Sequence, residues 1–106
     1  IDVSPLAKCP NLKEVVLESI TGPVDLAVFE GLKKLEALDV EGCKVLNPEA
    51  ITALPRLQRL DLQKTEGVAD FSMFKDLPKL KYIYAKVGQF PDEQIAPYGK
   101  KAIIQK

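Results

Sequence analysis

The 106-residue sequence contains no histidine and no tryptophan, and it has only two cysteines and one methionine. Without histidine, the chain cannot build a Ser–His or Cys–His nucleophile pair or a histidine-ligated metal site. No apolar run reaches the ~18 residues that a membrane-spanning helix needs, and no secretory signal peptide is visible. These absences argue against the commonest hydrolase and metalloenzyme classes and against membrane insertion.

The chain also lacks net charge, because fifteen lysines and arginines balance fifteen aspartates and glutamates. A neutral chain has no bulk charge with which to attract nucleic acid or an anionic membrane, so neither partner is expected. The charges are unevenly distributed, with a net charge of −4 in residues 1–53 and +4 in residues 54–106. The length favours one domain that buries its own core without a metal or disulfide.

What the sequence does contain is an internal repeat. A pattern of the form L-x-x-L-x-L starts at Leu12, Leu35, Leu57 and Leu80, so the copies are 23, 22 and 23 residues apart. Two further apolar columns precede each copy: Cys9, Leu32, Leu54 and Leu77 three residues before the leading Leu, and Leu6, Phe29, Ile51 and Phe74 three residues earlier. A period of 20–29 residues with this pattern indicates a leucine-rich repeat.

The sequence therefore resembles leucine-rich-repeat proteins, and within them the short-repeat, internalin-like class of bacterial type. Residues 1–7 resemble the inter-strand segment of that class, and residues 24–29 and 69–74 repeat it. The resemblance covers residues 1–90. It departs from the family at the asparagine column, which here holds Ile20, Cys43, Thr65 and Gly88. Cysteine and threonine can replace asparagine's backbone hydrogen bonds in part, but isoleucine cannot, so the first loop must satisfy its backbone differently.

The expected fold is an α/β leucine-rich-repeat solenoid, curved, with a parallel sheet on its concave face. Short helices or 3₁₀ turns form the return segments, which Pro10, Pro55 and Pro78 bring to an end. Asn47 followed by Pro48 is the best helix start, with Asn47 as its N-cap.

Residues 1–106 are expected to form a single domain. Residues 1–11 would end a preceding repeat, residues 12–90 would form four repeats, and residues 91–106 would form a C-terminal cap. Within the cap, residues 102–104 are expected to add a last, degenerate strand. Further repeats or another element upstream of Ile1 are expected to cover the open end of the stack.

The candidate functional residues lie between the apolar motif positions, because alternate residues of a strand face opposite sides of the sheet. The predicted partner-binding residues on the concave side are Glu18, Asp39, Glu41, Asp61, Tyr82 and Tyr84. Tyrosine is enriched at interface hot spots, and complementary charge steers association, so this face is a candidate protein-binding surface. One alternative is that these are ordinary solvated strand positions. Another, for the two tyrosines, is that the C-terminal tail folds back and covers them with the help of Tyr98 and Ile103.

One carboxylate pair invites a second interpretation. Asp39 and Asp61 fall in the same column of adjacent strands, where like charges disfavour joint ionisation. Such a pair could hold a cation, a partner's lysine or the proton of an acid–base reaction. An open sheet is expected to supply no enclosed pocket and little desolvation, and Arg59 and Lys64 are near enough to relieve the repulsion. No catalytic residue, metal or cofactor is therefore predicted.

The two cysteines are predicted to be free. Cys9 and Cys43 lie more than one repeat apart, too far for a disulfide, and both are expected to be buried thiols. Free thiols fit a reducing compartment slightly better, but they do not decide between a cytoplasmic and a secreted protein.

The predicted function is a protein–protein interaction module that binds a partner through the concave sheet. The resemblance to internalin-like proteins implies adhesion to a target protein or its modulation. The alternative is a structural spacer or targeting segment of a longer protein whose activity lies N-terminal to Ile1. An enzymatic function is not predicted, and the sequence does not identify the partner.

Overall fold

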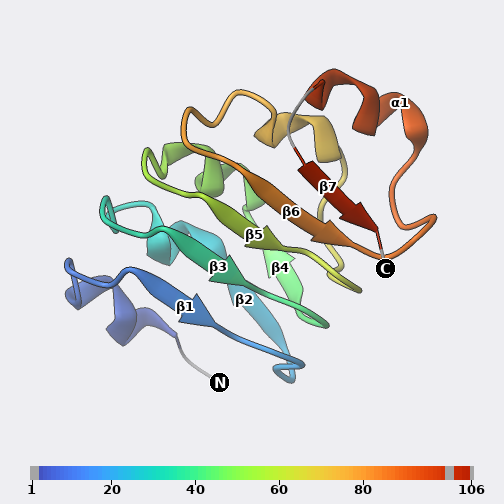
Figure 1. Ribbon diagram of the computed structural model, residues 1–106. Helices are drawn as coiled ribbons and strands as arrows, with labels where there is room; N and C mark the ends of the chain where they lie inside the picture. The colour runs from blue at the N-terminus through green and yellow to red at the C-terminus, as the bar shows by residue number, and fades with distance from the viewer. Residues whose placement is uncertain (1–2, 100–101, 106) are drawn as a thin grey trace.

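The computed structural model describes residues 3–99 and 102–105. The chain winds through successive turns, each with a strand on one side and a short helical segment on the other (Figure 1). A five-stranded parallel sheet has the order β1-β3-β5-β6-β7, formed by β1 (Glu14–Val16), β3 (Ala37–Asp39), β5 (Arg59–Asp61), β6 (Tyr82–Ala85) and β7 (Ala102–Gln105). A second, two-stranded parallel sheet consists of β2 (Pro23–Asp25) and β4 (Lys44–Leu46). This is the α/β solenoid that the repeat predicts.

The register of the large sheet confirms the assigned repeat. Leu38 lies opposite Val15 on one side and Leu60 on the other, and Leu60 lies opposite Ile83. All four side chains are buried in the core, because alternate strand positions point inward. The strand expected at 102–104 is observed as β7, which pairs with β6 in parallel.

The return segments are short helices, most of them 3₁₀ helices, as expected. They are η1 (Ser4–Lys8), η2 (Leu26–Phe29), η3 (Pro48–Ala53) and η4 (Phe71–Phe74), followed by α1 (Asp92–Ile95) and η5 (Ala96–Tyr98). Asp25 and Asp70 cap η2 and η4, since each carboxylate accepts a backbone N–H two residues on, at 3.0 Å. Asn47 occupies the N-cap position of η3, with Pro48 following it, as predicted, but its φ is +55° and its side chain makes no capping bond; it donates instead to Asp25 Oδ1 at 2.9 Å.

The asparagine column is filled as expected in two of its four positions. Cys43 Sγ donates to the Leu17 carbonyl and Thr65 Oγ1 to the Val40 carbonyl, both at 2.8 Å, so each bonds the backbone of the preceding turn. Ile20 has no polar group for such a bond, and the N–H groups of Leu17 and Ser19 pair with second-repeat carbonyls just as those of Val40 and Gly42 pair with third-repeat carbonyls.

In the fourth repeat the asparagine role passes from Gly88 to Gln89, which sequence reasoning missed. Gln89 Nε2 donates to the Leu62 carbonyl at 2.6 Å. Its Oε1 accepts the backbone N–H of Lys64 at 3.2 Å and that of Lys86 at 2.9 Å. One side chain thus joins the third and fourth turns. The sequence feature that could have indicated this is a glutamine one position after the asparagine column.

Residues 91–98 pack against the fourth return segment. The Phe71 ring stacks on the Phe90 ring, with their centroids 4.3 Å apart. The centroid of the Tyr98 ring lies 4.8 Å from that of Phe71. Tyr98 also donates its hydroxyl to the Phe71 carbonyl, and burial raises the pKa of this phenol. Gln94 Oε1 accepts the Phe71 N–H at 2.9 Å. The division into four repeats and a cap stays a prediction, but these contacts show where the tail is fixed.

Burial of both cysteines is a prediction that fails at Cys9. Cys43 is 1% exposed, as expected, whereas Cys9 is exposed although it occupies a core column. In the described part of the chain, no turn packs against the outer side of the first one, and Leu12 is only half-buried there. A core column is buried only where turns cover it on both sides. Both thiols are free, as predicted.

The two thiols should therefore react at very different rates. We expect Cys9 to be labelled at once by a bulky thiol reagent in the native state, and Cys43 only as the chain unfolds. Mass spectrometry of the labelled chain measures this directly, and a Cys9→Ser variant supplies the control, since it should remain unlabelled until denaturant is added. Equal rates at the two positions would contradict the observed packing.

A candidate binding face on the concave sheet

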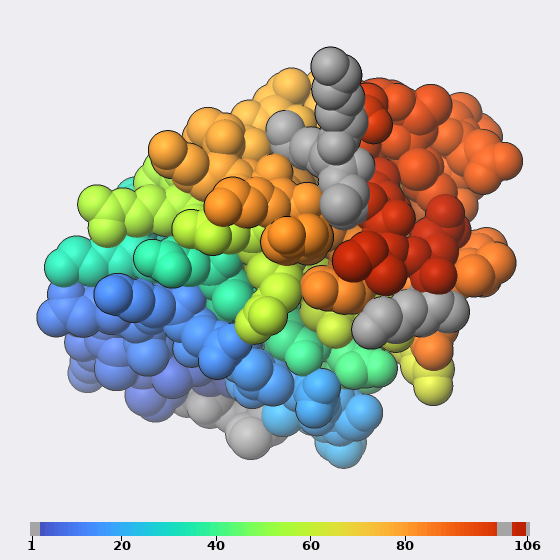
Figure 2. All heavy atoms as spheres, in the orientation of Figure 1, coloured from blue at the N-terminus to red at the C-terminus, as the bar shows by residue number. Residues whose placement is uncertain are grey.

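The outward residues of the large sheet form two rows that cross the strands. One row runs through Val16, Asp39, Asp61 and Tyr84, and the other through Glu14, Ala37, Arg59 and Tyr82. Figure 2 shows this side of the molecule, with the repeats as successive bands from the blue first turn to the orange fourth. The column predicted for Asp39 and Asp61 is thus observed.

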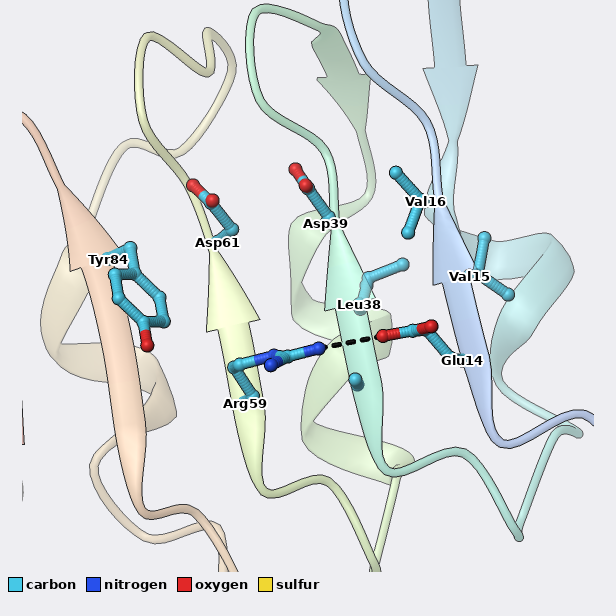
Figure 3. A pocket seen from close by; sticks show the side chains of 9 residues that line it. Glu14, Val15, Val16, Leu38, Asp39, Arg59, Asp61 and Tyr84 are labelled. Atoms are coloured by element: carbon cyan, nitrogen blue, oxygen red, sulfur yellow. Dashed lines mark hydrogen bonds and ion pairs between the residues drawn. The ribbon is translucent and has the colours of Figure 1, made fainter.

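A salt bridge crosses the second row. Arg59 donates to Glu14 Oε2 at 2.7 Å, reaching over β3 as Figure 3 shows. The residue between them is Ala37, whose methyl group leaves room for the guanidinium to pass. Both side chains are about half exposed, so the pair contributes at most about 1 kcal/mol to folding. Arg59 therefore pairs with Glu14 rather than relieving the Asp39–Asp61 repulsion.

Three carboxylates gather at the ends of β1 and β3. Oxygens of Glu18, Asp39 and Glu41 all lie within 4.8 Å of one another. A hydrogen bond with Asp39, followed by the negative charge of Asp39, raises the pKa of Glu18. Surface carboxylates commonly gather in this way without an ion, so no metal site is proposed here.

Asp61 extends this acidic end onto the next strand. Its burial raises the pKa of its carboxyl group, and the charge of Asp39 acts in the same direction, against a hydrogen bond from the Gln63 N–H. Burial, more than the neighbouring charge in the aspartate column, thus raises the pKa of Asp61.

The two aspartates also fix the backbone that follows each strand. Asp39 Oδ1 accepts the Glu41 N–H at 2.9 Å, and Asp61 Oδ1 accepts the Gln63 N–H at 3.0 Å. The same local arrangement arises in both repeats because each aspartate ends its strand and is followed two residues later by an unpaired donor. The carboxylates are consequently held in place on the face, and an Asp→Asn change would remove charge while keeping an acceptor.

The first row lies beside a hollow of about 210 Å³. Its walls include Glu14, Val16, Asp39, Arg59, Asp61 and Tyr84 (Figure 3). Tyr84 is half-buried in the wall, whereas Tyr82 is 45% exposed. Tyr98 and Ile103 do not cover the tyrosines, since Tyr98 is buried against Phe71 and Ile103 packs against the core, but the tail does lie beside them, because β7 pairs with β6 and places Ile104 next to Tyr84.

All six predicted binding residues thus lie along one face of the large sheet or at the ends of its strands. Glu18, Asp39 and Glu41 form one cluster, Asp61 and Tyr84 continue the row, and Tyr82 belongs to the neighbouring row. Sequence reasoning did not anticipate the salt bridge between Glu14 and Arg59. The repeat places both residues in one row with the small Ala37 between them, and this pattern could have indicated the pair.

The 22- to 23-residue period, the parallel sheet and the 3₁₀ return segments define the chain as a leucine-rich-repeat solenoid. Its structure resembles that of an internalin, InlF, from Listeria monocytogenes strain 4b F2365, with a TM-score of 0.75 and 24% identity over 98% of this chain and 31% of that chain. Internalin C2 of the same strain gives a TM-score of 0.72 and 24% identity over 99% of this chain and 46% of that chain.

These likenesses confirm the resemblance at the level of the fold. The chain spans less than half the length of either internalin. No protein-family model matches the sequence, and no curated protein matches it. Within residues 3–99 and 102–105, the structure has no helix that combines the length and the apolar character needed to cross a membrane.

Proposed function

We propose that this chain is a protein–protein interaction module that binds its partner through the concave sheet. The observation that supports this most is the continuity of the face: Asp39, Asp61 and Tyr84 occupy neighbouring strands in one row, beside a hollow. A row of fixed charges with an aromatic side chain on the next strand supplies both steering and an anchor. The internalin-like fold adds support, since the solenoid shape presents such a face to a partner.

The proposed division of roles follows from the geometry. Glu18, Asp39, Glu41 and Asp61 would attract a basic region of the partner, and Tyr82 and Tyr84 would supply buried contact area. The expectations that the chain is not an enzyme, holds no cofactor and binds neither nucleic acid nor a membrane remain predictions.

The test begins by capturing a partner with the intact chain and measuring the kinetics of the purified pair. Asp39→Asn with Glu41→Gln should slow association and flatten its dependence on salt, because steering charge is lost while the Asp39 acceptor remains. Tyr84→Ala should instead speed dissociation and weaken binding by about 2 kcal/mol, roughly 30-fold, if Tyr84 is a hot spot. Thermal unfolding of each variant verifies that it is folded.

Lys75→Ala is the matched control. Lys75 follows η4 on the return side and pairs only with Asp76, at 2.9 Å, among the described contacts. It should change neither rate. If the concave variants bind like the wild type while Lys75 or the Lys100–Lys101 pair is required, the partner uses another surface and the proposal is wrong.

A further inference from the structure

The concave face contains a longer trough than the acidic row alone. The hollow beside Asp39 and Asp61 shares Glu14, Ala37, Arg59 and Tyr84 with a second hollow, which also touches Glu36 and Gln58. A third hollow begins at Glu36 and Gln58 and is lined further by Arg56, Lys79 and Lys81. Neighbouring hollows are bordered by the same residues, so the three follow one another from the ends of β3 and β5 towards their beginnings, and this succession of hollows is called the trough.

The two ends of this trough carry opposite charge. Asp39 and Asp61 are the last residues of β3 and β5, so the acids lie where the strands end. Arg56, Lys79 and Lys81 precede the first residues of β5 and β6, so these cations lie where the strands begin. The charge gradient therefore runs parallel to the strands, and it is independent of the difference between the two halves of the sequence.

The cations at the basic end are available to a partner. The ion pairs found within residues 3–99 and 102–105 are Arg59–Glu14 and Lys75–Asp76, and neither involves Arg56, Lys79 or Lys81. One acid, Glu36, lines the same hollow as these three cations. This end therefore carries a surplus of positive charge on a concave surface, where low-dielectric walls strengthen its field.

We infer that the trough binds a bipolar protein segment that lies along the strands, with its basic end over Asp39 and Asp61 and its acidic end over Arg56, Lys79 and Lys81. This inference rests on the proposed function and specifies the partner's chemistry. Arg56 and Asp61 line opposite ends of the trough and are five positions apart, which is at most about 16 Å at ~3.3 Å per residue, or about 11 residues of helix. Apolar side chains at the middle of the segment would meet Tyr82 and Tyr84.

Uniformly charged partners fit this trough poorly. A uniformly basic segment would be attracted by the acidic end but repelled by Arg56, Lys79 and Lys81. A polyanion would be attracted by these cations but repelled by the acidic end. The basic end thus acts as a specificity element, because it rejects partners that the acidic row alone would accept.

The probe for this inference is a display library of random peptides of about 16 residues, long enough to span the trough. Three baits are compared: the wild-type chain, the trough variant Arg56→Glu/Lys79→Glu/Lys81→Glu, and the control variant Lys8→Glu/Lys44→Glu/Lys75→Glu. Both variants change the net charge equally, but the control residues line none of the three hollows.

Wild type and control should enrich peptides with one basic and one acidic half, and the trough variant should enrich basic peptides. A selected bipolar peptide should bind the trough variant at least about tenfold more weakly at low salt and the control within about twofold of wild type. Changing the acidic half of that peptide to lysines should restore binding to the trough variant and abolish it for wild type.

The outcomes separate this inference from the proposed function. If selected peptides depend on Asp39 and Tyr84 but are indifferent to the basic-end reversal, or are basic throughout, the bipolar inference is wrong and concave binding stands. If no enriched peptide responds to Asp39→Asn or Tyr84→Ala, both are wrong.

Discussion

Replacing Leu60 with alanine should lower the free energy of unfolding by about 2–5 kcal/mol. Leu60 is 0% exposed at the middle of β5, with Leu38 and Ile83 beside it on the neighbouring strands. The truncation leaves a cavity that both neighbouring turns share, so the whole array loses stability rather than one repeat. Thermal or urea unfolding measures the loss, and the midpoint temperature should fall by about 8 °C or more.

Leu46→Ala is the matched control, because it removes the same atoms from β4, where Leu46 is 45% exposed. It should cost no more than about 0.5 kcal/mol. Equal losses at the two positions, or a Leu60→Ala midpoint within a degree or two of wild type, would contradict the register of the repeats.

Replacing Gly67 with alanine should cost about 3 kcal/mol, through a contact rather than a cavity. Gly67 has a φ of +103°, and a Cβ added there would lie 2.2 Å from the Val45 carbonyl oxygen. That carbonyl belongs to β4, where the Val45 N–H donates to the Glu66 carbonyl and the Glu66 N–H to the Cys43 carbonyl. Relieving the clash must loosen these two hydrogen bonds, at about 1 kcal/mol each, in addition to about 1 kcal/mol for the strained φ.

Gly88→Ala separates the cost of the steric clash from the cost of the strained φ. Gly88 also has a positive φ, +81°, but a Cβ there would meet nothing within 4 Å. It should therefore cost about 1 kcal/mol, from backbone strain alone. Unfolding curves of both variants give the comparison, and a Gly88→Ala loss as large as that of Gly67→Ala would show that the clash with Val45 is relieved without cost.

Periodicity was sufficient to predict which residues share a row of the sheet. Once the copies are aligned at Leu35 and Leu57, Asp39 and Asp61 must fall in one column, and both are found there. The same reasoning failed at Cys9, because a column states which way a side chain points and not whether another turn covers it. At Asn47 it predicted the N-cap position correctly but not the capping bond, because the side chain donates to Asp25 instead of accepting a backbone N–H.

The sequence by itself determined the repeat length, the parallel sheet, the inward column through Leu38 and Leu60, and the single face shared by the six candidate binding residues. These features follow from local periodicity, which every turn of a solenoid repeats. The packing of neighbouring turns was needed to show that Gln89 replaces the missing asparagine, that Arg59 reaches Glu14 across Ala37, and that acidic and basic hollows follow one another along the strands. Each of these depends on how far a side chain extends between neighbouring turns, and distances across turns are set by packing rather than by spacing along the chain.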